Sequence, residues 1–140
     1  MTNDLSDVNV LLALHLPSHE NHRQACDWFD AAEGFALTPI TQAGLVRLLL
    51  NPVVMNGAPA SPASALAALD ALQSAPGATF WPDDTPQLLG RFAYALTGHR
   101  QVTDLHLLAL AVSKGGRLVT ADAKIPAALR RADTKHVHLI

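Results

Sequence analysis

The sequence predicts an α/β fold with a central, mostly parallel sheet of four or five strands and helices on both faces, a three-layer α/β/α arrangement. Short apolar segments alternate with longer segments of helical periodicity along the 140 residues. Hydrophobic residues make up 49 % of the chain, enough for a substantial core. Right-handed crossovers between such strands give parallel neighbours. We expect residues 1–140 to form one domain.

The first strand is expected over residues 5–8, although its polar residues make it a weak strand. Asn9 can cap an apolar helix over 10–16, which Pro17 ends. Ser18 can cap a second helix that reaches about residue 32. One face of this second helix is apolar and carries Ala25, Trp28 and Phe29.

A brief strand over residues 35–37 precedes a helix that Thr41 can cap and that ends before Pro52. The apolar side of this helix carries Leu45, Leu48 and Leu49. Residues 53–62 are rich in Gly and Pro, which indicates a surface loop. The next helix, over 64–74, has a common stripe of Leu66, Leu69 and Leu72.

A third strand is expected over residues 79–81. Pro86 can open a helix that Gly98 closes, with inward-facing Leu89, Phe92, Ala93 and Leu96. Thr103 can cap the following helix, whose buried stripe would be Leu105, Leu108, Ala109 and Val112. The chain should then form a strand over 117–120, a turn with a short helix over 122–128, and a last strand over 137–140.

Composition excludes several classes of protein. The net charge of −2 and the aromatic content of 5 % give no support to nucleic-acid binding through overall basicity or through an aromatic stacking platform. Cys26 is the single cysteine, so the chain has no internal disulfide and fits a reducing compartment. The start of the chain does not resemble a signal peptide, and the apolar run 10–14 is far shorter than the roughly 20 residues of a membrane span. We therefore expect a soluble, cytoplasmic protein.

Three acidic residues lie where the fold should bring the ends of strands together. Asp7 is at the exit of the first strand, Asp122 lies just past the exit of the fourth, and Asp104 is in the first turn of a long helix. Sites in parallel sheets form beyond the carboxyl ends of the strands. Carboxylates that lie so near to one another repel each other, and a bound Mg²⁺ or Mn²⁺ would relieve this repulsion. Phosphodiester hydrolysis is the natural reaction of such a site.

Each acid has a simpler explanation when it is taken alone. Asp104 is favoured in the first turn of a helix by the helix dipole. Asp122 can cap the turn that follows it, and Asp7 can cap the helix after the first strand. The metal-site hypothesis therefore depends on the three acids occurring together.

Four segments in order are more specific than any single acid: Asp7-Val-Asn9-Val, then residues 39–52, 98–111 and 118–122. Together they closely resemble the PIN-domain ribonucleases, in particular the VapC-type toxins of bacterial toxin–antitoxin pairs. The resemblance covers almost the full chain, and the segment 98–111 is its most distinctive part. It implies a PIN fold, a Mg²⁺- or Mn²⁺-dependent endoribonuclease, a homodimer and a cognate VapB-type antitoxin.

The resemblance also implies roles for individual residues. Asp7, Asp104 and Asp122 match the first, third and fourth family acids and would hold the metal. It also implies that Thr120, the hydroxyl beside Asp122, belongs to the catalytic residues. The supporting residues that it implies are the polar Asn9, Arg47 on the helix of the second acid, and the residue in the place of that acid. That second acid is usually Glu, and its place is taken here by Gln42, which keeps an acceptor oxygen but has no charge.

Contact with substrate phosphate would need basic side chains. The candidates are Arg47, Arg91, Arg100, Lys114 and Lys124, and Arg47 is favoured because it follows Gln42 on the same helix.

Two other functions are compatible with parts of the pattern. A haloacid-dehalogenase-like phosphatase also uses an Asp after strand one and Mg²⁺, but it needs a second Asp where this chain has Asn9. A PIN-like module that has lost activity through Gln42 could survive as a partner-binding protein. Hydrolysis of a phosphomonoester would favour the phosphatase, and absence of RNA cleavage would favour the partner-binding module.

Overall fold

The computed structural model describes residues 3–140, which contain a sheet of five parallel strands in the order β3-β2-β1-β4-β5. The strands are β1 (Asp4–Ser6), β2 (Phe35–Leu37), β3 (Ala78–Phe80), β4 (Arg117–Thr120) and β5 (Val137–Leu139). The predicted parallel sheet is confirmed, and β4 has the predicted bounds.

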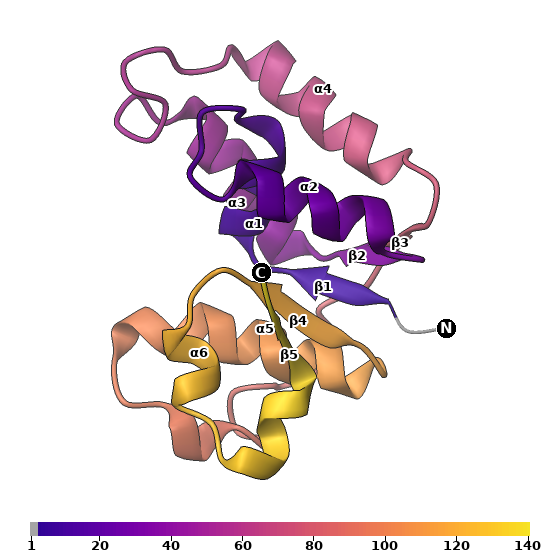
Figure 1. The fold of residues 1–140 in the computed structure, drawn as a ribbon, viewed down its shortest axis with the longest axis vertical. Helices are drawn as coiled ribbons and strands as arrows, with labels where there is room; N and C mark the ends of the chain where they lie inside the picture. The colour runs from indigo at the N-terminus through magenta and orange to yellow at the C-terminus, as the bar shows by residue number, and fades with distance from the viewer. Residues whose placement is uncertain (1–2) are drawn as a thin grey trace.

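Helices cover both faces of this sheet. They are α1 (Val8–His15), α2 (His22–Ala31), α3 (Pro39–Leu50), α4 (Pro62–Gln73), α5 (Val102–Ser113) and α6 (Lys124–Ala127), with 3₁₀ turns η1 (Ala93–Ala95), η2 (His99–Gln101) and η3 (Arg131–His136). Helices α1 to α4 lie on one side of the sheet, and α5 and α6 lie on the other (Figure 1). The three-layer α/β/α prediction is confirmed. None of the helices in residues 3–140 is long and apolar enough to cross a membrane.

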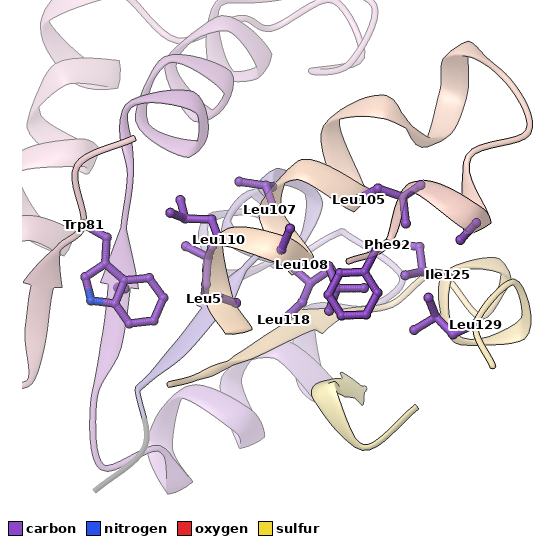
Figure 2. Close-up of a cluster of buried hydrophobic side chains, with 14 residues drawn as sticks. Leu5, Trp81, Phe92, Leu105, Leu107, Leu108, Leu110, Leu118, Ile125 and Leu129 are labelled. Carbon is purple, nitrogen blue, oxygen red and sulfur yellow. The ribbon is translucent and has the colours of Figure 1, made fainter. Parts of the chain in front are cut away.

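Alternation along the strands divides the buried side chains into two clusters. Leu5 and Leu118 pack with the apolar side of α5, together with Phe92 and Ile125 (Figure 2). On the opposite face, the neighbouring strand residues pack against α1 to α4: Phe35, Leu37 and Val119. The central strands β2, β1 and β4 are therefore buried on both faces, as is typical of parallel sheets.

The strand order creates a switch point between β1 and β4. From β1 the chain builds β2 and β3 on one side, and then crosses to build β4 and β5 on the other. Ligand sites in open α/β sheets form where the order reverses, outside the carboxyl ends of the strands. Ser6 and Val119 are paired at this edge, so the residues that follow β1 and β4 emerge side by side.

The start of α1 differs from the prediction. Asp7, not Asn9, is the N-cap of α1, and its Oδ1 atom accepts a hydrogen bond of 2.9 Å from the Val10 N–H. Asp is itself a strong N-cap residue, so the helix begins as soon as the strand ends at Ser6.

Two later helices also begin away from their predicted caps. Helix α2 begins at His22 rather than after Ser18, because turns occupy the chain between α1 and α2. The N-cap of α3 is Thr38, whose N–H donates to Thr41 Oγ1 at 3.1 Å. Thr41 therefore lies inside the first turn of α3, where it supports the cap instead of being the cap.

Side-chain burial on α4 and the start of α5 also correct the predictions. Leu66 on α4 is 57 % exposed, and the small Ala65 takes the buried position instead. Thr103 lies inside α5 because η2 continues directly into that helix, which has Gln101 as its N-cap.

The predicted helix after Pro86 is wrong. The chain from there to η2 consists of turns and the short η1. Tertiary contacts determine its path: Phe92 is buried in the core, while Arg91 and Tyr94 bind the carboxylate of Asp133 at 2.8 and 2.6 Å. Three of the residues expected to face inward are exposed, namely Leu89, Ala93 and Leu96.

Candidate metal centre

Asp7 is fixed at the end of β1 by hydrogen bonds to both of its carboxylate oxygens. The Val10 N–H donates to Oδ1 at 2.9 Å, and the hydroxyl of Thr120 donates to Oδ2 at 2.6 Å. The Asp7 N–H donates to the Val119 carbonyl at 2.9 Å, which extends the pairing of β1 with β4. The buried carboxylate therefore has a fixed orientation at the switch point.

Asp122 is tied to Asp7 through the same threonine. Its backbone N–H donates to Thr120 Oγ1 at 3.1 Å, so that this hydroxyl accepts from Asp122 while it donates to Asp7. The Asp122 side chain is exposed, and its Oδ1 accepts from the Lys124 N–H at 2.9 Å. Asp122 thus caps the turn before α6, as its simpler explanation predicted, and still stands at the sheet edge.

Asp104 reaches the same edge from the other face of the sheet. It lies in the first turn of α5 and is half-buried. Helix α5 precedes β4 in the chain and runs back along the sheet, so its N-terminus lies near the carboxyl ends of the strands.

The electrostatics show that the three carboxylates lie close enough to oppose one another's ionisation. Burial, followed by the charges of Asp7 and Asp122, raises the pKa of Asp104 from 3.8 to about 6. Burial also raises the pKa of Asp7, and the charge of Asp122 adds to this increase. Hydrogen bonds from Thr120 and Val10 lower the pKa of Asp7 in part. The fold therefore gathers negative charge at the switch point.

The three carboxylates form an oxygen donor set of the kind that Mg²⁺ and Mn²⁺ bind. Within residues 3–140, no three acidic, His or Cys side chains are close enough together to hold one ion directly. Mg²⁺ usually takes one or two carboxylates and keeps several waters. The donor set fits such a cation if one carboxylate binds through water or changes its rotamer.

Two hollows meet at Asp122. The first, called the Arg100 hollow, has a volume of about 260 Å³ and a polar rim of Arg100, Gln101, Asp104, Asp122 and Lys124. Its remaining surface is apolar and consists of Ala95, Leu105, Ile125 and Ala128.

The second hollow, called the His19 hollow, has a volume of about 360 Å³. Its polar lining includes Asp7, Asn9, His19, Glu20, Asn21 and Asp122. Asp122 lines both hollows, Asp104 lines the first and Asp7 lines the second, and the two hollows together are called the cleft.

Comparison with known proteins identifies the family. The family model described as PIN domain matches residues 5–131. The chain belongs to the PIN-domain family. The resemblance inferred from the sequence is therefore confirmed, and the haloacid-dehalogenase-like alternative is set aside.

Curated relatives of this PIN domain include three named ribonucleases of Mycobacterium tuberculosis (strain ATCC 25618 / H37Rv). The chain is 50 % identical to Ribonuclease VapC39 over 125 residues, which cover 86 % of this chain and 89 % of that protein. It is 43 % identical to Ribonuclease VapC38 over 123 residues, covering 86 % of each. It is 42 % identical to Ribonuclease VapC29 over 120 residues, covering 85 % of each.

Not every site residue expected of a PIN domain reaches the carboxylates. Asn9 is exposed in the first turn of α1 and lines the His19 hollow. Gln42 donates instead to the side chain of Gln73 on α4, and lines a separate hollow beside β2 and β3. Arg47 is exposed in the last turn of α3 and lines neither hollow of the cleft.

Two features of this PIN-domain cleft were not predicted from the sequence. The turn that carries His19, Glu20 and Asn21 walls one side of it, and Gln101 shapes the loop on the other side. The turn was missed because a helix had been predicted for these residues, directly after Ser18. The Gly98-His-Arg-Gln101 sequence could have indicated the loop, because a Gln three residues after a glycine can reach back to its N–H.

Proposed function

We propose that this chain is a Mg²⁺- or Mn²⁺-dependent endoribonuclease of the VapC type, the toxin component of a VapBC-type toxin–antitoxin pair. The supporting observation is the convergence of Asp7, Asp104 and Asp122 at the switch point, where their charges oppose one another. Within residues 3–140, none of the three forms an ion pair with a basic side chain. Uncompensated carboxylates at one edge are costly to the fold and useful for holding a cation.

The chain's own residues prepare the site for hydrolysis of an RNA phosphodiester. Thr120 keeps Asp7 oriented and ionisable, because its hydrogen bond favours the charged carboxylate. In the metal-free chain, burial and the charges of Asp7 and Asp122 raise the pKa of Asp104 to about 6, and a bound cation would favour its charged form. When bound, a divalent cation lowers the pKa of an attacking water and neutralises charge on the phosphoryl oxygens.

The proposed partners are an RNA substrate, a VapB-type antitoxin and a second copy of the chain. Support for a protein partner comes from exposed apolar side chains on the α1–α4 side and the adjoining sheet edge, including Leu66 at 57 % and Phe80 at 53 % exposure.

The experiment compares RNA cleavage by the wild type with that of Asp7→Asn and Asp104→Asn, with Mn²⁺ or Mg²⁺ present and with EDTA. We expect cleavage only with metal, and a loss of about 100-fold or more in kcat/KM for each variant. Asp70→Asn is the matched control, because Asp70 is an exposed carboxylate on α4. Equal behaviour of wild type and both site variants would contradict the proposal and favour the non-catalytic module.

A further inference from the structure

The Arg100 hollow combines an apolar floor with a charged rim. Leu105 and Ile125 belong to the core and are only 5 % and 6 % exposed, and they lie near Phe92 in Figure 2. Asp104 and Asp122 stand on the rim with Arg100 and Lys124. Its volume of about 260 Å³ is below the roughly 300–1,000 Å³ of sites for drug-sized ligands, so it suits one small group.

The two cations on the rim differ from most of the other basic candidates. Arg91 binds Asp133 at 2.8 Å, and Lys114 binds Asp84 at 3.4 Å. In the part of the chain that the structure describes, neither Arg100 nor Lys124 forms an ion pair, and both are exposed. They therefore retain their charges for a ligand that carries negative charge.

Local hydrogen bonds fix the backbone segments that carry the two cations. The Gln101 Oε1 atom accepts from the Thr97 N–H and hydroxyl at 2.8 Å and from the Gly98 N–H at 2.9 Å, which fixes the loop that carries Arg100. The Lys124 N–H donates to Asp122 at 2.9 Å, which fixes the turn that carries the lysine. The backbone on both sides of the hollow is thus fixed before a ligand binds.

We propose that the Arg100 hollow binds one nucleotide of a single-stranded RNA beside the phosphate that is cut. Its base lies on the apolar floor, and Arg100 and Lys124 contact its backbone phosphates. This inference rests on the proposed function, because the acidic rim is the proposed metal centre. The occupant would be a single splayed-out base, as is usual for recognition of single-stranded RNA.

The cations are tested by measuring the affinity of a fluorescein-labelled single-stranded oligoribonucleotide against salt concentration, in EDTA to prevent cleavage. We expect Arg100→Ala and Lys124→Ala each to reduce the salt slope by about 0.7, the value for one lost phosphate contact on a single strand. Arg100→Lys should retain the slope because it keeps the charge. Arg23→Ala is the control, because Arg23 is an exposed cation on α2.

The floor is tested by Ala128→Leu, which fills the hollow from its exposed side without changing charge. We expect the affinity to fall about fivefold or more, the effect of losing one base contact, with an unchanged salt slope. Affinities and slopes equal to those of the wild type in all three site variants would overturn the subsite.

Cleavage kinetics separate this proposal from the proposed function. We expect Arg100→Ala to raise KM with little change in kcat, because it removes binding common to substrate and transition state. If the wild type cuts RNA but KM is unchanged in all variants, the subsite is wrong and the nuclease stands. If binding changes as expected but the wild type never cuts RNA, the subsite stands and the nuclease is wrong.

Discussion

At the scale of single residues, Thr120 connects two of the three acids through one hydroxyl group. It donates to Asp7 at 2.6 Å and accepts from the Asp122 N–H at 3.1 Å, and it is fully buried. A buried side chain with two such bonds determines where both acids stand. The role that we propose for Thr120 is positional, because it would act on the reaction through Asp7 and Asp122.

Replacing Thr120 by Val keeps the shape of the side chain and removes both hydrogen bonds. We expect unfolding to become easier by about 1–3 kcal/mol, because Asp7 loses a buried donor. RNA cleavage should fall by about tenfold or more, because the two acids lose their common support. Thr120→Ser restores the hydroxyl and should recover both the melting temperature and the cleavage rate. Equal rates for Val and Ser would contradict this role.

Asp104 should make the metal-free protein less stable as pH rises. Its pKa in the folded chain is about 6, against 3.8 for an ordinary Asp, so the folded state binds its proton more tightly than the unfolded state. The resulting loss of stability develops between these two values and is complete above about pH 6. Asp104→Asn should therefore be more stable than wild type at pH 7.5, and the two proteins should be equally stable at pH 3.5. The expected difference at pH 7.5 is only about 1 kcal/mol, because Asp104 is partly solvated.

Urea unfolding in EDTA at these two pH values measures the effect. A stability difference between Asp104→Asn and wild type that is the same at both pH values would contradict the raised pKa of Asp104.

At the scale of elements, the segment between β3 and α5 has no regular helix, and it still forms one wall of the cleft through Ala95. Asp133 in η3 anchors it, since Arg91 and Tyr94 both bind that carboxylate. These bonds lower the pKa of Asp133, so the charged form is the one that holds the segment. The anchor is therefore present at neutral pH and is lost as pH falls below the ordinary value of 3.8.

We expect Asp133→Ala to release this segment. Limited proteolysis at neutral pH should cut the chain between β3 and α5 several times faster than in wild type, since the local opening costs less. The matched control is Asp84→Ala, which removes an ion pair to Lys114 at 3.4 Å between partly exposed side chains. Such pairs contribute little, so its digestion should match wild type. Equal digestion of the Asp133 variant would contradict the anchor.

Sequence patterns predicted the regular elements well and the irregular ones poorly. The bounds of β4 and the helix after it follow from short apolar runs and turn residues close to them in the chain. Caps were misplaced where two capping residues compete, as Asp7 does with Asn9. The helix after Pro86 was predicted from local periodicity, but a contact with Asp133, forty-two residues after Arg91, determines its path. Local patterns do not report contacts of that range.

The candidate site could be predicted in part for the same reason. Asp7 and Asp122 follow strands, and the rule for parallel sheets brings strand ends together whatever the intervening chain does. Whether the side chains of Gln42 and Arg47 reach the site depends on which face of α3 is turned toward it. The hydrogen bond between Gln42 on α3 and Gln73 on α4 cannot be predicted from the spacing of these residues in the sequence.

At the scale of the whole molecule, the strand order accounts for the site. The order β3-β2-β1-β4-β5 places the ends of β1 and β4 together, and α5 brings Asp104 to the same edge from the other face of the sheet. Residues far apart in the chain thus meet at one point, with two hollows on either side of Asp122. The central claim is that these three acids act as one cation site.

Isothermal titration calorimetry of the metal-free protein with Mn²⁺ tests this claim most directly. We expect the wild type to bind Mn²⁺, and Asp7→Asn, Asp104→Asn and Asp122→Asn each to weaken binding about tenfold or more, while Asp70→Asn binds as the wild type does. Unchanged Mn²⁺ affinity in any one of the three site variants would show that the acids do not form a common site.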